Sequence, residues 1–366
     1  MASLGLAKAL TDKGVKITFV LPNKADLNIN FLNLVFADLK KVQGTYTTSS
    51  KSSRLGFAND YITAAYQFGE RVREVAAKHG SDIIHSHDWL TFPAGLAARE
   101  VTGKPLVTHV HSTEFDRTGG HYPNPEVYEI EKKGLQRSDK IISVSQFTKN
   151  LLVENYGINP DKVSVIHNAV TDPGKKDVAP GLTSFKKLGY KIVLYLGRIT
   201  LQKGPEYFIR AAKKVVEYES KVVFVVAGSG DMQEQMIKEA AGLGILGNVL
   251  FTGFLRGEEI DRIYQAADLY VMPSVSEPFG ITSLEAVING TPVIVSKQSG
   301  VSEVLTNVLK VDFWDIDEMA NKILSVVKYD PLQKCLAQNA MVDIKDCTWD
   351  KAAEKCLQVY ESLINH

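Results

Sequence analysis

The feature that most constrains the fold of this chain is a regular alternation of short apolar runs with longer amphipathic stretches. Apolar runs rich in β-branched residues predict buried strands, whereas the amphipathic stretches predict helices. This rhythm is typical of parallel sheets that are covered by helices on both faces. The expected strands form two sets, at residues 16–21, 82–85, 106–109, 140–144 and 163–166, and at residues 191–196, 221–227, 249–251, 269–272 and 292–295.

The two sets of strands predict an α/β protein with two Rossmann-like, doubly wound domains. A chain of 366 residues is long for one domain and sufficient for two of about 150 residues each. Residues 173–189 are rich in proline, glycine and lysine, and we interpret them as a linker. We therefore expect a first domain at 1–172, a second domain at 190–346 and a C-terminal helix within 347–366.

The beginning of the chain departs from the usual order of a doubly wound domain. Residues 1–10 have the pattern of the first helix, and residues 16–21 have the pattern of the second strand. Such a domain normally opens with a strand and a glycine-rich turn ahead of that helix. We interpret the first domain as N-terminally truncated, lacking its first strand, and we predict a gap in its sheet.

Composition excludes some classes of partner. Lys+Arg and Asp+Glu both number 42, so the formal net charge is zero, which argues against nucleic acid or an anionic membrane as a partner. No apolar run reaches the length of a membrane span, and no signal peptide opens the chain. The three cysteines match no metal-binding motif and are interpreted as reduced thiols of a cytoplasmic protein. The oligomeric state stays open.

A candidate anion site lies at the end of the expected strand 269–272. Gly280 begins a short helix, which places the helix N-terminus at the edge of the sheet where α/β folds bind ligands. The free amides of Gly280, Ile281 and Thr282 can hold a phosphate, helped by the helix dipole.

Two glutamates flank this helix start. Glu285 lies about 6 Å along the helix axis at about 1.5 Å per residue, and its side chain tilts back toward the phosphate, where it could accept hydrogen bonds from a ribose diol. Glu277 precedes the helix in the loop and could accept from sugar hydroxyls. For an isolated pair of glutamates, solvated surface carboxylates are the more common interpretation.

Two cations follow the first strand of the second set. Arg198 and Lys203 belong to one loop, and a guanidinium fork together with an ammonium suits a diphosphate. They could stabilise the charge that develops on a nucleoside-diphosphate leaving group. A surface cation pair is the simpler interpretation of these two residues taken alone. A third glycine-rich loop at residues 227–231 is equally compatible with a plain turn.

Four histidines end two neighbouring strands of the first set. His85 and His87 end one of them, and His109 and His111 end the next. A metal site is one alternative, although no carboxylate or cysteine motif completes it. The other is that His85 and His109 are hydrogen-bonded at the ends of buried strands, with His111 placed to face a cleft.

These motifs together, in this order, resemble the family-4 retaining glycosyltransferases, and in particular the glycogen and starch synthase branch. Each motif alone is weak, but the ordered set spans nearly the whole chain. The matching residues are His85-Ser86-His87-Asp88-Trp89, His111, Gly197-Arg198 with Lys203-Gly204, Gly253-Phe254, and Glu277-Pro278-Phe279-Gly280 followed by Glu285.

The resemblance implies a GT-B arrangement, in which two domains face each other across a cleft and the C-terminal helix crosses back to the first domain. It implies a nucleoside-diphosphate sugar donor such as UDP- or ADP-glucose, a glycan acceptor such as an α-glucan, and no metal or other cofactor. The implied catalytic residues are His111, Arg198, Lys203 and Glu277. Asp88 is implied to lie nearer the acceptor. Other residues are implied to bind the donor. The donor residues are Phe254 beside the base, Phe279, Gly280, Ile281 and Thr282 at the phosphate or sugar, and Glu285 at the ribose.

Two departures from the family bear on this expectation. The glycine-rich loop of the first domain would lie before residue 1, and the sequence after His111 is Ser112-Thr113-Glu114 where the glycogen synthases often carry asparagine. Two other functions therefore stay open. One is a sugar-nucleotide epimerase of the same architecture, and the other is a non-catalytic protein that binds a sugar nucleotide or a glycan.

Overall fold

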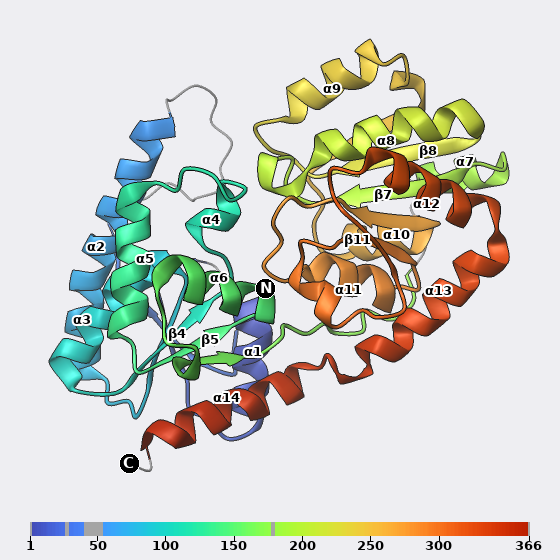
Figure 1. Cartoon of the computed structure of the whole chain (residues 1–366). Coiled ribbons are helices and arrows are strands. Elements are labelled where there is room, and N and C mark those ends of the chain that lie inside the picture. Colours follow the sequence, from blue (N-terminus) through green and yellow to red (C-terminus); the bar gives the residue numbers. More distant parts are fainter. Residues whose placement is uncertain (1, 26–28, 40–53, 177–179, 365–366) are drawn as a thin grey trace. The chain divides into compact units, whose positions relative to one another are not determined.

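The computed structural model describes residues 2–25, 29–39, 54–176 and 180–364, and it divides into two compact units. The first unit contains residues 1–115, 121–168 and 349–366, and the second contains residues 116–120 and 169–348. Both units are built from parallel β-strands with helices packed against them (Figure 1). The predicted class, α/β with two Rossmann-like domains, is confirmed.

The second unit contains a six-stranded parallel sheet of order β12-β11-β10-β7-β8-β9. This is the doubly wound order 3-2-1-4-5-6, with β7 as the first strand and β10 as the fourth. The order therefore reverses between β7 and β10. The strands are β7 (Lys191–Leu196), β8 (Val222–Ala227), β9 (Val249–Gly253), β10 (Leu269–Met272), β11 (Val293–Ser296) and β12 (Leu309–Val311).

Helices cover both faces of this sheet, which explains why its strands read as continuous apolar runs. Every residue of β8, β10 and β11 is buried. Alternate strand residues such as Val193, Phe224 and Val271 pack with α8 and α12 in one core. The helices are α7 (Pro180–Lys187), α8 (Pro205–Tyr218), α9 (Gln233–Gly242), α10 (Glu258–Ala266), α11 (Ile281–Ile288), α12 (Ile316–Lys328) and α13 (Asp330–Asp343).

The first unit contains two parallel sheets. Four strands form the order β3-β4-β5-β6, and β1 pairs with β2. Within the described residues, no ladder joins β1 to β3, and the break lies where the first strand belongs in the order 3-2-1-4-5-6. The strands are β1 (Thr18–Leu21), β2 (Asn33–Phe36), β3 (Ile84–His87), β4 (Leu106–Val110), β5 (Lys140–Ser143) and β6 (Val163–Val165).

The N- and C-terminal helices lie side by side on one face of the four-stranded sheet (Figure 1). Leu6 and Leu10 of α1 and Ala353 of α14 share a core there with Val107 of β4 and Ile142 of β5. The helices of this unit are α1 (Ala2–Asp12), α2 (Arg54–Lys78), α3 (Phe92–Thr102), α4 (Glu114–Arg117), α5 (Pro125–Arg137), α6 (Gln146–Tyr156) and α14 (Trp349–Ile364).

Elements that were not predicted include the strands β2 and β12 and the helix α7. The helix α7 lies within the stretch that was interpreted as a linker, and it packs on β7 with Leu182 5% exposed. The domain boundaries at 172, 189 and 346 stay predictions.

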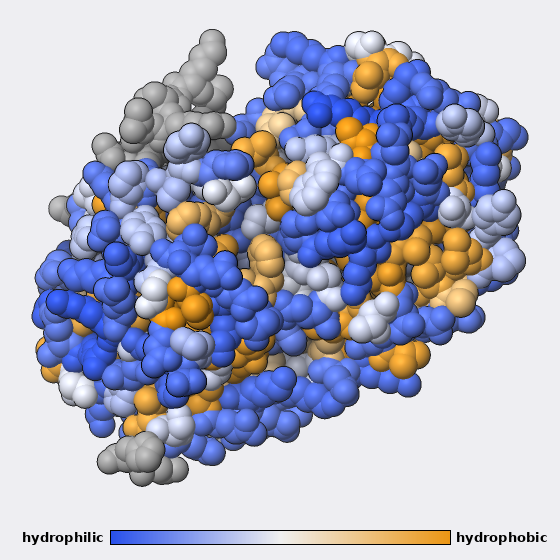
Figure 2. All heavy atoms as spheres, viewed as in Figure 1, coloured by the Kyte–Doolittle hydropathy of each residue, from blue (hydrophilic) through white to orange (hydrophobic). Residues whose placement is uncertain are grey.

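The surface that Figure 2 shows is largely hydrophilic, with apolar side chains interspersed. Among the described helices, none is both long and apolar enough to cross a membrane.

Candidate functional site

The loops that follow β7 and β10 bring two predicted site residues into contact. Lys203 ends the short 3-10 helix Leu201–Lys203, and Glu277 lies in the loop before α11. Lys203 Nζ lies 2.5 Å from Glu277 Oε2, and the hydroxyl of Ser274 donates to the same oxygen at 3.1 Å. Since β7 and β10 flank the point where the strand order reverses, this contact lies where doubly wound folds bind ligands.

Backbone hydrogen bonds hold Glu277 from two directions. Its amide donates to the carbonyl of Gln298 at 3.0 Å, and its carbonyl accepts from Gly300 at 2.9 Å. The side chain of Gln202 donates to the carbonyl of Ser276 at 3.1 Å. Ser274 and Gln202 thus contact the site residues although sequence reasoning missed them. The hydrogen bond of Gln202 joins residues 74 positions apart and leaves no local pattern, whereas Ser274 lies only three residues before Glu277.

Arg198 occupies the same loop as Lys203. Its guanidinium donates from Nη2 to Gln202 Oε1 at 3.1 Å, and its carbonyl accepts from the Tyr195 hydroxyl at 2.8 Å. The residue is exposed, so the guanidinium can reach a ligand at the carboxyl ends of the strands. A fixed backbone with an exposed planar donor suits recognition of a phosphate.

The glycine-rich loop after β8 packs against this cation loop. A Cβ atom on Gly228 would lie 1.9 Å from the carbonyl oxygen of Gly197, and one on Gly230 would lie 2.2 Å from that of Ile199. Only glycine permits this approach of two backbones. These glycines therefore shape the loop that carries Arg198 and Lys203.

The start of α11 leaves backbone amides available to an anion. Gly280 is the N-cap at φ +108°, and no side chain of the described residues caps this end. The first amides of a helix lack intrahelical partners and point toward the positive end of its dipole. Gly280, Ile281 and Thr282 thus lie at a helix start as expected, with the Thr282 hydroxyl 2.9 Å from that of Tyr270. Phe279 is only 2% exposed, and its carbonyl accepts from the amide of Val301 at 2.6 Å.

Glu285 lies on the first turns of α11 and is largely buried. Burial raises its pKa above the ordinary value, against the opposing effect of the Tyr264 hydroxyl, which donates to Oε2 at 3.4 Å. Removal from water makes the carboxylate a stronger partner for a ligand hydroxyl. Tyr264 gave no signal in the sequence, because it resembles any core tyrosine of an amphipathic helix.

Phe254 follows β9 and is 64% exposed, which is unusual for a phenylalanine. The guanidinium carbon of Arg256 lies 5.2 Å from the centre of its ring. An exposed ring that is already in contact with a cation offers a stacking surface for a planar group. Arg256 was not predicted from the sequence.

The four histidines of the first unit form a stack on one face of its sheet. Neighbouring ring centroids lie 4.3 to 5.4 Å apart, with interplanar angles of 12 to 25°. His87 Nδ1 lies 2.9 Å from His111 Nε2, and His85 Nδ1 lies 2.6 Å from the hydroxyl of Tyr360. His85 therefore has the hydrogen bond expected of it, whereas neither ring nitrogen of His109 has a partner among the described residues.

Burial keeps these imidazoles neutral. It lowers the pKa of His87 to about 3 and that of His111 to about 4. The same cause holds the pKa values of His85 and His109 well below the usual range. At neutral pH each ring therefore has one N–H donor and one free lone pair.

Asp88 fixes the backbone that carries His111. Its Oδ1 accepts from the amides of His111 at 2.7 Å and Ser112 at 3.2 Å. Asp88 itself has φ +57°, a strained conformation for a residue other than glycine. These contacts position the loop after β4 at the edge of the first sheet.

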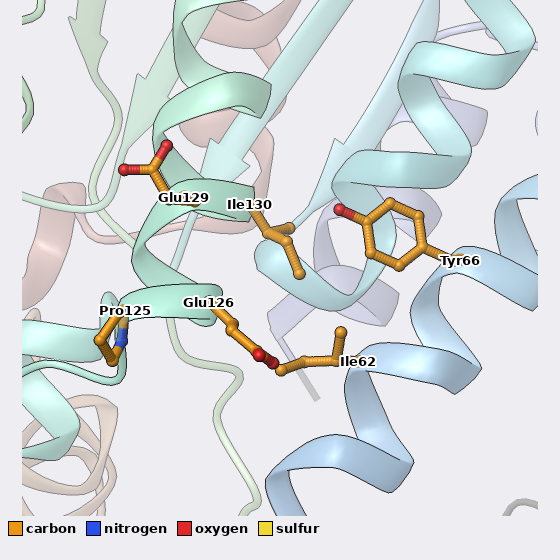
Figure 3. Close-up of a pocket in the computed structure, with 6 residues that line it drawn as sticks. All are labelled: Ile62, Tyr66, Pro125, Glu126, Glu129 and Ile130. Carbon is orange, nitrogen blue, oxygen red and sulfur yellow. The ribbon is translucent and has the colours of Figure 1, made fainter.

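A hollow in the first unit is lined by none of the predicted site residues. It encloses about 460 Å³ between α2 and α5 (Figure 3). Its lining includes the carboxylates of Glu126 and Glu129 and no basic side chain, which suits a diphosphate poorly.

Comparisons with known proteins identify the family of this chain. The model of glycosyltransferase family 4 matches residues 3–172, and that of glycosyl transferases group 1 matches residues 183–342. An uncharacterised glycosyltransferase of Methanocaldococcus jannaschii is 33% identical over 297 residues, which cover 76% of this chain and 75% of that protein. The chain belongs to the family-4 glycosyltransferases of the GT-B type.

Two further relatives have more specific names. The D-inositol 3-phosphate glycosyltransferase of Mycolicibacterium smegmatis is 29% identical over 77% of this chain and 69% of its own length. A glycogen synthase of Mycobacterium tuberculosis is also 29% identical, over 62% of this chain and 54% of its own length.

Solved structures share the fold. Sucrose-phosphate synthase from Thermosynechococcus elongatus has a TM-score of 0.81 at 21% identity, covering 98% of this chain and 92% of that one. Anabaena Alr3699/HepE, solved in complex with UDP and glucose, has a TM-score of 0.75 at 18% identity, covering 99% of this chain and 96% of that one.

Proposed function

We propose that this glycosyltransferase transfers a hexosyl group, glucose, from UDP- or ADP-glucose to a glycan acceptor such as an α-glucan, with retention of configuration. The observation that carries the proposal is the ion pair of Lys203 with Glu277 beside the start of α11. It supports the proposal because the ammonium that we assign to the phosphate lies next to the carboxylate that we assign to the sugar hydroxyls. The glycogen synthase relative and the neighbour that was solved with UDP and glucose support the choice of glucose.

In this proposal two cations provide most of the electrostatic stabilisation of the transition state. Arg198 and Lys203 stabilise the charge that grows on the departing diphosphate, and the amides at Gly280 and Ile281 assist them. The acceptor attacks the face from which the diphosphate leaves, and a phosphate oxygen takes the acceptor proton. This chemistry needs no metal ion and no nucleophile from the protein.

The remaining residues bind and orient the substrates. Glu285 accepts from the ribose diol, Glu277 from sugar hydroxyls, and Phe254 stacks on the base. His111 lies beside the transferred sugar in its neutral form, and Asp88 holds the backbone of His111 in place. The reaction takes place in the cytoplasm, where sugar nucleotides are made.

The test is a donor screen on the whole chain, followed by turnover. UDP, ADP and GDP are first compared for thermal stabilisation, because a ligand that binds only the folded state raises the melting temperature. Release of the nucleotide from UDP- and ADP-glucose is then measured with glycogen, with inositol phosphate and without an acceptor. We expect release that depends on glycogen.

The other outcomes distinguish the alternatives. An epimerised sugar nucleotide formed without any acceptor would identify an epimerase. Stabilisation without turnover of any donor would identify a non-catalytic binding protein. Release that depends on inositol phosphate would keep the transferase and replace the α-glucan as acceptor, as the relative that acts on D-inositol 3-phosphate suggests.

A further inference from the structure

Three of the stacked histidines form a cluster in which each ring could offer one nitrogen to a metal ion. His87 is the register partner of His109 across β3 and β4, and His85 lies two residues before His87 on the same face. The ring centroids of these three residues are 4.5, 5.1 and 5.4 Å apart. One ring nitrogen of each lies within 4.8 Å of the others. Hydrogen-bonded strands hold all three side chains on one rigid surface.

Several nitrogens of this cluster lack any hydrogen bond. In the part of the chain that the structure describes, His85 Nε2 and both ring nitrogens of His109 are buried without a partner. His109 is only 2% exposed. A buried polar atom without a partner costs about 1–3 kcal/mol, and one ion that takes a nitrogen from each ring would satisfy His85 Nε2 and one nitrogen of His109.

We propose that His85, His87 and His109 bind one divalent transition-metal ion. Zn²⁺ is the representative ion, and Ni²⁺ and Cu²⁺ are close analogues. Neutral imidazole is a preferred ligand of these ions, whereas Mg²⁺ and Ca²⁺ prefer carboxylate and carbonyl oxygens. A tetrahedral site with Zn–N bonds of about 2.0–2.1 Å separates its nitrogens by about 3.3 Å. In the structure the nitrogens lie within 4.8 Å of one another, so binding of the ion requires the side chains to rotate and bring them closer by about 1.5 Å.

The surroundings of the cluster match those of a metal site. His85 Nδ1 lies 2.6 Å from the Tyr360 hydroxyl. When Nδ1–H donates to that oxygen, the lone pair of Nε2 is free for the metal, and the outer hydrogen bond fixes the ring. His85 and His87 are partly exposed, which leaves a route for the ion. His87 also contacts His111 at 2.9 Å, so a bound ion would restrain the histidine that we place beside the sugar.

The binding itself does not depend on the proposed transfer reaction, and its test needs no turnover. The whole chain, without a histidine tag and freed of metal by a chelator, is titrated with Zn²⁺ by calorimetry, with Mg²⁺ as a comparison. We expect one equivalent of Zn²⁺ to bind and Mg²⁺ not to bind. His109→Ala should weaken the binding of Zn²⁺ at least about tenfold. The matched control is His79→Gln, an exposed histidine outside the cluster, which should bind as the unchanged chain does.

A spectroscopic measurement covers the case in which His109→Ala does not fold, as judged by circular dichroism. Electron paramagnetic resonance of one equivalent of Cu²⁺ on the unchanged chain reports the number of nitrogen ligands directly. Three imidazole nitrogens would support the site. A single nitrogen, or equal affinity of Zn²⁺ for the unchanged chain and folded His109→Ala, would overturn it.

Discussion

Lys203 and Glu277 lie 74 positions apart in the sequence, yet their charged atoms meet at 2.5 Å. Their side chains are 21% and 9% exposed, so the ammonium group is partly removed from water. Its electrostatic interaction with a bound ligand is therefore stronger than it would be in water. We expect Lys203→Ala to lower the rate of nucleotide release at least about tenfold, since a single preorganised donor contributes about that much or more. The rate is measured at saturating UDP- or ADP-glucose, whichever donor the screen selects.

The control for this substitution is Lys238→Ala. Lys238 is 74% exposed and pairs with Glu234 one helical turn away, a contact that contributes little. It should leave both the rate and the melting temperature unchanged. An unchanged rate in folded Lys203→Ala would remove Lys203 from the reaction.

The three cysteines should differ strongly in reactivity. Cys335 is exposed, whereas Cys356 is fully buried in α14 and burial raises the pKa of its thiol to about 12. The thiolate is the reactive form, so iodoacetamide at pH 8 should label Cys335 quickly and Cys356 only after unfolding. Peptide mass spectrometry over time measures both rates. Equal labelling of the two in the folded protein would show that α14 is not packed as described.

Helix α14 follows the second unit in the sequence but belongs to the first unit. Its Trp349 packs against α1 at a glycine, Gly5. A Cβ atom on Gly5 would lie 2.5 Å from the ring of Trp349. Gly5→Ala should therefore lower the free energy of unfolding by about 1–3 kcal/mol, because the ring has to move out of a packed position. Chemical denaturation measures this change.

Gly242→Ala is the matched substitution. Gly242 ends α9, and nothing lies within 4 Å of the position that its Cβ would occupy. Alanine favours a helix over glycine by roughly 0.5–1 kcal/mol, so this variant should be neutral or slightly more stable. If Gly5→Ala also left the free energy of unfolding unchanged or raised it, the described packing of α1 on α14 would be wrong.

Strands and helices were predictable from the sequence where burial imposes one pattern on many residues. The run of β8 is apolar throughout because both faces of the strand are covered. β12 was not predicted although β6, which also has three residues, was, and α7 begins with Pro180 in a stretch that resembles a linker. For strands and helices, the sequence therefore indicates which segments are buried along their whole length. It does not indicate which distant segment a short element packs against.

The candidate site was predictable only as a set of loops. Motifs placed Lys203 and Glu277 at the same sheet edge, but their direct contact depends on the register of two strands far apart in the sequence. The glycines at 228 and 230 had appeared equally compatible with a plain turn, and their role became visible only through the backbone that they touch. The stack of histidines likewise depends on the pairing of β3 with β4.

At the level of the whole chain, each unit has a hydrophobic core of its own, so the two should respond differently to ligand and to mutation. The proposed donor site lies in the second unit, whereas Gly5 and Trp349 belong to the first. Differential scanning calorimetry should therefore resolve two transitions. UDP at about 100 times its dissociation constant should stabilise only the second unit, by about 2.7 kcal/mol.

Gly5→Ala identifies the transitions in this experiment, because it should lower the melting temperature of the first unit and leave that of the second in place. Lys203→Ala should reduce the shift that UDP causes, without moving the transition that Gly5→Ala moves. If UDP instead raised the transition that Gly5→Ala lowers, nucleotide binding would have to involve the first unit. The loops after β7 and β10 would then be insufficient to describe the site.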